Sequence, residues 1–197
     1  MTGLATRWAS QFYATLGDDR PAADALKDAS LRSDLKRWTS TLTSVVVQSF
    51  ERMGWAAAGK RHRCSVLPVS RDEYLTQDVM AFPATGTGWR FPVAVCELEN
   101  SADAAFVAYS LWKVLCVRCG LRILFCYRPK PSEGPEFVSS LVTSVVDAMP
   151  IAERVALGGD TLVVVGSRSE SGTFPYGFFR AWKLNSNTGR FERFARQ

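Results

Sequence analysis

Three acidic side chains lie in or beside two apolar segments, where a carboxylate is costly. Asp78 belongs to the apolar segment 77–82, while Glu97 and Glu99 lie near the end of the Val-rich segment 90–99. Residues two apart in a strand point to the same face, so Glu97 and Glu99 share a face. Like charges on one face of a buried strand are unfavourable unless something offsets them. A divalent cation would do so, and this pattern therefore predicts a metal site.

Mg²⁺ or Mn²⁺ is the cation that suits these donors, because both ions prefer hard oxygen ligands. We expect Asp78, on a neighbouring strand, to complete a cup with Glu97 and Glu99. A metal held there can generate hydroxide and stabilise charge on a phosphodiester oxygen. In the alternative interpretation the two glutamates face solvent and Asp78 is an edge residue. The apolar neighbours Cys96 and Leu98 favour the buried arrangement.

Two further glutamates are weaker candidates for the same site. Glu73 precedes Asp78 in a loop, and Glu51 lies late in a long expected helix. A glutamate at such a position is more often a solvated surface residue than a metal ligand. The chain has a single histidine, His62, which excludes a His-rich metal centre. The predicted ligands are therefore carboxylates.

The elements that must position these residues follow from hydrophobic periodicity, which switches between helical and strand spacing along the chain. Two helices, three strands, a helix, a strand, a further helix and three strands are expected in chain order. This order of elements predicts an α/β fold with a mixed central sheet and helices on both faces. Ser101 is a candidate cap for the third helix, with Asp103 in its first turn. The expected helices are 3–16, 31–53, 101–120 and 137–149, and the expected strands are 64–69, 76–82, 90–99, 121–127, 161–166, 177–184 and 190–194.

Asp78, a Glu-x-Glu sequence about twenty residues later, an amphipathic helix and a buried strand together resemble the PD-(D/E)xK nuclease superfamily. The αβββαβ core of that restriction-endonuclease-like fold corresponds to residues 31–127. Asp78 matches the motif Asp, Glu97 the (D/E) and Glu99 the final position. Gln77 replaces the usual Pro and Glu99 the usual Lys, although some restriction enzymes of the superfamily have Glu there. The resemblance implies one nuclease-like domain over 1–197, with a C-terminal helix and β extension over 134–197.

By the same resemblance, the protein is a metal-dependent hydrolase of phosphodiester bonds, with DNA endonuclease activity favoured. Asp78, Glu97, Glu99 and the backbone carbonyl of Leu98 would bind Mg²⁺ or Mn²⁺, and Glu99 would otherwise orient the attacking water. Lys113, from the helix after the motif, would replace the missing lysine and stabilise charge. A lysine that only pairs with a nearby carboxylate is the competing interpretation of Lys113.

Tyr109 stands four residues before Lys113 on the same helix face. We interpret it as a core residue, because an aromatic side chain at helical spacing is more often packed inside than functional.

Charge and composition are compatible with a nucleic-acid partner. The 197 residues carry a net charge of +5, which favours a polyanion without requiring one. Lys60, Arg61, Arg63, Arg128 and Lys130 are the first candidates for phosphate contacts. The same role is open to the later residues Arg168, Arg180, Lys183, Arg190, Arg193 and Arg196.

Other features narrow the class of protein. A hydrophobic content of 47% with 22% charged residues excludes a disordered or fibrous chain. No segment reaches the roughly 18 apolar residues of a membrane helix, and residues 1–17 lack the apolar core of a secretory signal. We therefore expect a cytoplasmic protein whose five cysteines are free buried thiols.

Other functions remain open beside the nuclease. A nuclease-fold subunit without catalysis could bind nucleic acid or assemble with a protein partner, and Glu99 in place of the motif lysine motivates that alternative. Many nucleases that cut both strands pair, so a homodimer is an expectation from the resemblance. A glycosidase ranks last, because two glutamates two residues apart on one strand cannot flank a scissile bond.

Overall fold

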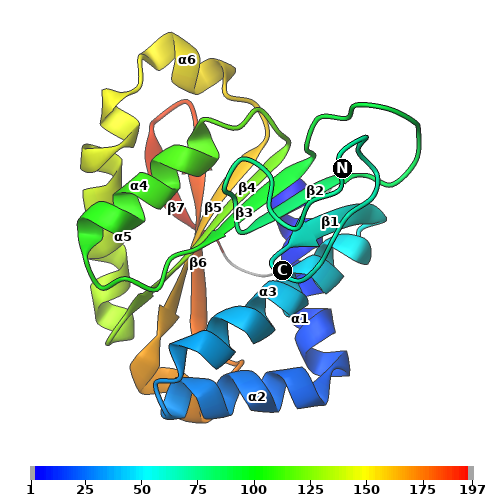
Figure 1. Ribbon diagram of the computed structural model, residues 1–197. Helices are drawn as coiled ribbons and strands as arrows, with labels where there is room; N and C mark the ends of the chain where they lie inside the picture. Colours follow the sequence, from blue (N-terminus) through cyan, green and yellow to red (C-terminus); the bar gives the residue numbers. More distant parts are fainter. Residues whose placement is uncertain (1–2, 195–197) are drawn as a thin grey trace.

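Seven strands form one mixed sheet in residues 3–194, the part of the chain that the computed structural model describes (Figure 1). The strands follow one another across the sheet in chain order. The pairs β3–β4 and β4–β5 are parallel, and the other neighbouring pairs are antiparallel. The strands are β1 (Trp55–Gly59), β2 (Val79–Pro83), β3 (Ala94–Leu98), β4 (Leu121–Arg128), β5 (Asp160–Ser167), β6 (Phe179–Asn185) and β7 (Arg190–Phe194).

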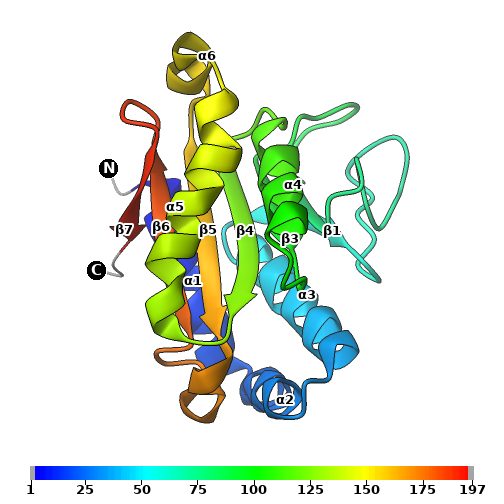
Figure 2. The same ribbon diagram turned by 90° about the vertical axis from the view of Figure 1, so that its left-hand side faces the viewer.

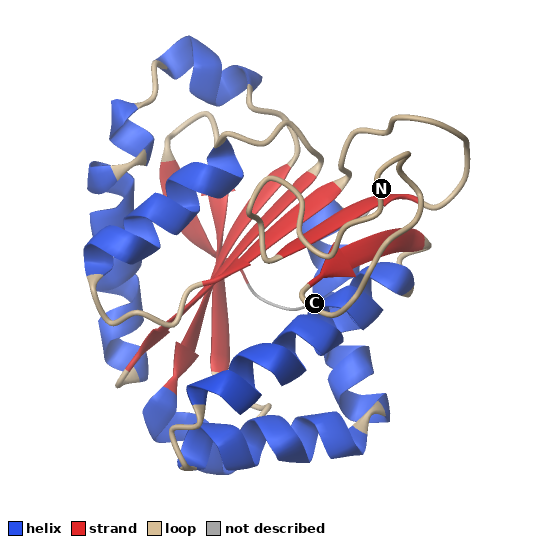
Figure 3. Ribbon diagram, in the orientation of Figure 1, coloured by secondary structure: helices blue, strands red, loops and turns tan. Residues whose placement is uncertain are grey.

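Helices cover both faces of this sheet, which confirms the expected α/β fold (Figure 3). Helices α1 and α3 pack on one face and α4 and α5 on the other, and Figure 2 shows α5 in front of the sheet with α1 behind it. No helix within residues 3–194 is long and apolar enough to cross a membrane. The helices are α1 (Leu4–Asp18), α2 (Arg20–Leu31), α3 (Leu35–Glu51), α4 (Ala104–Leu115), α5 (Gly134–Ser144) and α6 (Ile151–Ala156).

Strand β3 separates two hydrophobic cores, because its successive side chains point to opposite faces. Cys96 and Leu98 belong to the core beneath α1 and α3. Val95 belongs to the core beneath α4 and α5. Glu97 follows the same alternation, so its carboxylate is on the α4 side of the sheet.

The expected αβββαβ order is present as α3–β1–β2–β3–α4–β4. Its first strand was wrongly placed at 64–69, however. That segment contains Pro68, which cannot donate to a ladder, and forms only an isolated bridge between Cys64 and Arg71. The first strand is Trp55–Gly59, whose alanines have weak strand propensity and whose conformation is set by antiparallel pairing with β2.

Two helices were missed. Asp18, Asp19 and Pro21 indicated the end of the first helix, but Asp19 also caps α2 by accepting a hydrogen bond from the Ala22 amide, with Pro21 in the first turn. The long helix of the prediction therefore begins at Leu35 rather than at Leu31, which is the last residue of α2. The expected helix 137–149 divides into α5 and a short 3₁₀ turn, after which α6 follows.

Helix α4 differs from the expectation at both ends and on its outer face. Asp103, not Ser101, is its N-cap, because the Asp103 carboxylate accepts a hydrogen bond from the Ala105 amide at 2.9 Å. The helix ends at Leu115, which leaves Cys116 exposed rather than buried. Tyr109 is 58% exposed, so the interpretation of Tyr109 as a core residue was wrong.

Arg122 is the bulkiest of the fully buried side chains among the described residues, with 1% of its surface exposed. Its guanidinium donates to the carbonyl of Val117 at 3.0 Å, of Gly158 at 2.9 Å and of Leu157 at 3.2 Å. These carbonyls lie after α4 and after α6, so one side chain joins the two segments that enter β4 and β5. Burial lowers the pKa of Arg122 from its ordinary value.

We predict that Arg122→Met lowers the free energy of unfolding by about 3 kcal/mol or more, because buried carbonyls lose a charged donor. Urea denaturation measures this change. Arg118→Met is the matched control, since Arg118 is exposed four residues away and should be replaceable at little cost. Equal midpoints for the two variants would show that the Arg122 hydrogen bonds are not needed for stability.

Candidate active site

Asp78 and Glu97 face each other across the antiparallel pair β2–β3. Val79 pairs with Cys96 and Met80 with Val95, so Asp78, one residue before β2, continues the register opposite Glu97. The Asp78 amide donates to Glu97 Oε1 at 3.3 Å. The start of β2 and the end of β3 therefore bring the two acidic residues together.

The backbone of β3 also holds the Asp78 side chain. Asp78 Oδ2 accepts a hydrogen bond from the Leu98 amide at 2.8 Å. Asp78 thus contacts the strand through both its backbone and its side chain, which fixes the orientation of its carboxylate. This is a local consequence of the pairing of the two strands.

Lys113 reaches this acidic pair from α4. Its Nζ forms an ion pair with Glu97 Oε1 at 2.9 Å and donates to the Thr76 carbonyl at 2.8 Å. The Lys113 side chain is 16% exposed and that of Glu97 is 6% exposed. Helix α4, the start of β2 and the end of β3 therefore bring a lysine and two carboxylates into one site.

Both carboxylates are held away from full solvation. Burial is the main cause that raises the pKa of Glu97 to about 7, the neighbouring Asp78 charge adds to this, and Lys113 opposes it. Burial also raises the pKa of Asp78, against the hydrogen bond from Leu98. Each shift disfavours the charged form, so the site is short of positive charge even with Lys113 present.

Glu99 is not a third member of the acidic pair, although its charge adds to the raised pKa of Asp78, and this corrects the prediction of a cup of three carboxylates. Strand β3 ends at Leu98, and the Glu99 carboxylate accepts hydrogen bonds from the Ser101 amide at 2.7 Å and from Ser110 Oγ at 3.2 Å. Glu97 and Glu99 both face α4, as the strand alternation predicted. Within residues 3–194, no three Asp, Glu, His or Cys side chains gather as a group that could hold a metal ion.

The weaker candidate ligands differ in their positions. Glu73 is exposed but close enough to add to the raised pKa of Asp78. Glu51 is exposed at the end of α3, just before β1 begins at Trp55. The start of β2, next to Asp78, pairs with the opposite end of β1, at Gly59. Glu51 is therefore remote from Asp78.

The donors that do converge fit a small divalent cation. Magnesium sites commonly use one or two protein carboxylates and complete their shell with water and substrate phosphate. Two carboxylates with raised pKa values, side by side and partly buried, form the kind of site whose charged state a cation stabilises. Asp78 and Glu97 meet that requirement, whereas the Glu99 carboxylate is held by Ser101 and Ser110.

Candidate phosphate-binding residues lie at the same edge of the sheet. Gly59 ends β1 beside β2, and a Cβ at that position would approach the Asp78 carbonyl to 3.0 Å. Lys60 and Arg61 follow it and are exposed. Arg63 is also exposed and forms an ion pair with Asp72 at 2.9 Å. The segment after β1 therefore carries exposed positive charge and begins next to the backbone of Asp78.

Arg128 is the last residue of β4 and Lys130 lies two residues beyond it; because β4 runs parallel to β3, both lie at the edge where Glu97 is found. The Arg128 guanidinium is 3.2 Å from the centre of the Phe137 ring and donates to backbone carbonyls. Lys130 is exposed. Arg128 is thus packed in place, whereas Lys130 extends from the surface.

Most of the later basic residues have structural contacts. Lys183 pairs with Asp160 at 2.7 Å, and Arg193 lies over the Trp182 ring. Arg196 lies outside the described residues. The remaining contacts are Arg168 over the Tyr127 ring, Arg180 with the Pro131 carbonyl and Arg190 with Asp147.

Sequence reasoning missed two contributors to the site, Thr76 and Ser110. The Thr76 carbonyl carried no sequence signal, because any residue supplies a carbonyl. Ser110 stands three residues before Lys113, and that helical spacing could have indicated a shared face. Gln77 Oε1 and Asn100 Oδ1 are buried without a hydrogen-bond partner among the described residues, and Asn100 Nδ2 donates to Thr39 of α3, on the other side of the sheet from α4.

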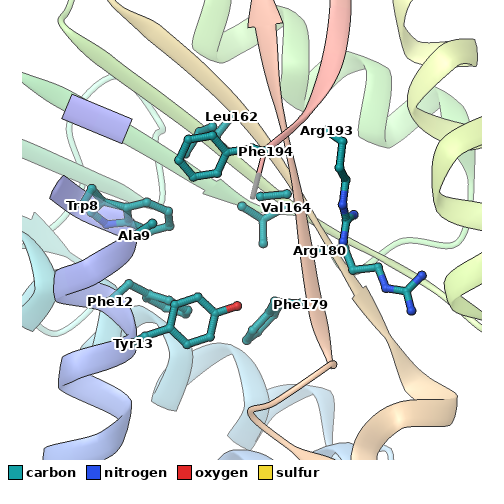
Figure 4. Close-up of a pocket in the computed structure, with 11 residues that line it drawn as sticks. Trp8, Ala9, Phe12, Tyr13, Leu162, Val164, Phe179, Arg180, Arg193 and Phe194 are labelled. Atoms are coloured by element: carbon teal, nitrogen blue, oxygen red, sulfur yellow. The ribbon is translucent and has the colours of Figure 1, made fainter. Parts of the chain in front are cut away.

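A pocket of about 190 Å³ lies elsewhere, between α1 and strands β5 to β7 (Figure 4). Trp8, Phe12 and Phe179 contribute to its aromatic wall. These residues belong to the core on the α1 and α3 side of the sheet, opposite the face that carries Glu97. The pocket is therefore separate from the acidic pair.

Comparison with known proteins adds little to this geometry. No family model matches the sequence, and no curated protein matches it. A solved structure, described as E. coli MS115-1 NucC in its cAAA-bound form, is 14% identical and covers 98% of this chain and 84% of its own. The TM-score is 0.46, which is too low to assign a fold or a function.

We predict that the protein becomes less stable as pH rises from about 4.5 to about 7 in the presence of a metal chelator. In the folded state burial raises the pKa of Glu97 to about 7, whereas the ordinary pKa of a glutamate is 4.5. The folded state therefore binds more protons in this window, and the stability gained from that binding is lost as pH rises. Glu97→Gln should remove up to roughly 3 kcal/mol of this dependence.

Urea denaturation at several pH values measures the effect. Glu51→Gln is the control, because Glu51 is exposed and remote from Asp78, and it should keep the dependence of the wild-type protein. If Glu97→Gln kept the pH dependence of the wild-type protein, the raised pKa of Glu97 would not be its source.

Proposed function

We propose that this protein is a divalent-metal-dependent nuclease of the PD-(D/E)xK type. The observation that carries the proposal is the convergence of Asp78, Glu97 and Lys113 where β2, β3 and α4 meet. The element order α3–β1–β2–β3–α4–β4 supports it, because it is the order of the core that this sequence resembles. A carboxylate pair with a lysine is a common arrangement for hydrolysis of a phosphodiester.

Asp78 and Glu97 would hold Mg²⁺ or Mn²⁺, with the Leu98 carbonyl as a further candidate ligand. The bound ion would supply an activated water and positive charge at the phosphate. The protein contributes preorganised ligands: the Leu98 amide orients Asp78, and the strand pairing sets Glu97 opposite it. Glu99 remains a candidate for orienting water, although its carboxylate is held by Ser101 and Ser110.

Lys113 would stabilise the negative charge that develops on the phosphate during hydrolysis. Its ammonium group is held in position at the site by its contacts with Glu97 and the Thr76 carbonyl. Its position on α4 replaces the lysine that the motif would place at Glu99. A charge held in advance near the reacting group lowers the barrier without the reorganisation that water would need.

Nucleic acid is the substrate that the surrounding charge favours, and DNA is our first choice of polymer. Lys60 and Arg61 are exposed beside β2, and Lys130 is exposed beyond β4. Lysine and arginine at these positions can contact backbone phosphates irrespective of sequence. The net charge of +5 agrees with a polyanionic partner.

A nucleic-acid-binding or assembly subunit without catalysis is the second candidate. The observation that favours it is the ion pair between Lys113 and Glu97, because the lysine takes the place of a metal ion at Glu97 Oε1. The Glu99 carboxylate is likewise engaged, by Ser110. In such a protein the lysine would serve to neutralise a buried carboxylate. Pairing with a second copy or with another protein would then supply the function.

We predict that Asp78→Asn, Glu97→Gln and Lys113→Met each reduce cleavage by at least about 100-fold, because the first two remove a charged ligand of the metal ion and the third removes the positive charge at the phosphate. Plasmid, linear duplex, single-stranded DNA and RNA are incubated with Mg²⁺ or Mn²⁺ and, separately, with a chelator. Cleavage should require the metal, and circular dichroism should show that each variant is folded.

Glu51→Gln is the matched control and should cut like the wild-type protein. Wild-type rates in Asp78→Asn would show that the site is misassigned. Measurable binding of a nucleic acid without cleavage, by a folded wild-type protein, would instead favour the non-catalytic subunit.

A further inference from the structure

Helix α4 carries a row of exposed aromatic side chains on its outer face. Phe106 and Tyr109 are each 58% exposed and Trp112 is 54% exposed. The opposite face of the helix is buried, with Val107, Leu111 and Val114 in the core, so the helix does not need these aromatics for its own packing. Exposed apolar clusters of this kind mark binding surfaces more often than isolated exposed residues do. We call Phe106, Tyr109 and Trp112 the α4 aromatic row.

Two rings of this row are already stacked on each other. The Tyr109 and Trp112 ring centres are 5.9 Å apart, and the angle between the ring planes is 21°. The two rings are therefore nearly parallel, and each remains more than half exposed, so aromatic surface is open to solvent here. Such a surface suits another flat aromatic group, because stacked and offset rings attract one another.

The α4 aromatic row continues into the candidate active site. Phe106, Tyr109 and Lys113 follow at spacings of three and four residues, which places them on one stripe of the helix. Lys113 Nζ is 2.9 Å from Glu97 Oε1. At 1.5 Å per residue, the stripe from Phe106 to Lys113 is about 10 Å long, the length of about three stacked nucleotides.

Positive charge lies at both ends of this helix. Arg128 Nη1 donates to the carbonyl of Ala102 before α4, and Arg118 is exposed just after it. The one acidic residue at the helix start, Asp103, is engaged with the Ala105 amide. The helix that carries the aromatic row therefore has a cation near each end, which suits bases attached to a phosphate backbone.

We propose that the α4 aromatic row stacks the unpaired bases of a single strand whose backbone enters the candidate active site. The inference rests on the proposed function and specifies its substrate as single-stranded or locally unpaired nucleic acid. In a duplex the faces of the bases are covered by their neighbours, and only their edges are open to a protein. Ring faces on α4 can be used only by bases that have left such a stack, and stacking of this kind tolerates any base sequence.

The test compares binding of a fluorescently labelled oligo-dT with that of a labelled hairpin duplex of equal nucleotide number, by fluorescence anisotropy in a chelator that prevents cleavage. Tyr109→Leu and Trp112→Leu keep an apolar side chain but remove the ring. Each should weaken oligo-dT binding about 10-fold or more. Hairpin binding should stay within about 2-fold of wild type, because phosphate contacts are unchanged. Tyr109→Phe should bind like wild type.

Trp89→Leu is the matched control, since Trp89 is 73% exposed in the loop between β2 and β3, at the end of these strands away from Asp78 and Glu97. It should leave oligo-dT binding unchanged. Equal oligo-dT affinity of wild type, Tyr109→Leu and Trp112→Leu would overturn the proposal. A change in oligomeric state of the Leu variants without nucleic acid would also overturn it, because the row would then be a protein interface.

The outcomes separate this inference from the nuclease itself. Metal-dependent cleavage with no effect of the Leu variants on oligo-dT binding would keep the nuclease and overturn the stacking surface. Ring-dependent oligo-dT binding by a protein that never cleaves would support the stacking surface and overturn the nuclease.

Discussion

The ion pair between Lys113 and Glu97 is the contact on which the candidate site depends. Glu97 lies on a core strand opposite a second carboxylate, Asp78, and burial raises the pKa of both. Lys113 is the cation that pairs with this acidic site, and it comes from α4. Without that lysine, two like charges would face each other in a partly buried place, which is unfavourable unless protons or a metal ion neutralise them.

That requirement makes the position of α4 part of the chemistry. The connection from β3 through α4 to the parallel strand β4 lays the helix over the sheet, as such crossovers do. Arg122 then ties the segment after α4 to the segment after α6 through backbone carbonyls. One helix thus supplies the lysine at the site, the serine that holds Glu99 and the exposed aromatic row. Catalytic groups placed on such a supported helix are held more firmly than groups on a loop.

The features that could be predicted from the sequence are those set by local spacing. Alternation placed Glu97 and Glu99 on one face, and the strand order brought Asp78 near them. What could not be predicted is the partner of each carboxylate: Glu99 keeps the expected face, but its carboxylate accepts hydrogen bonds from the Ser101 amide and Ser110 rather than lying against Asp78. In the same way β1 is selected by its pairing with β2, because its alanines carry little strand signal. Helix periodicity identified α4, but the exposure of Tyr109 reflects how the helix is rotated on the sheet.

The most direct test of the acidic pair as a metal site is anomalous diffraction from crystals of the wild-type protein soaked in Mn²⁺. A metal site at this pair should give an anomalous peak bound by the carboxylates of Asp78 and Glu97, at distances of about 2.0–2.3 Å. No such peak is expected in Asp78→Asn crystals treated identically. Wild-type crystals with no peak there, and with Lys113 still paired to Glu97, would show that Asp78 and Glu97 do not form a metal site and that the lysine neutralises them by itself.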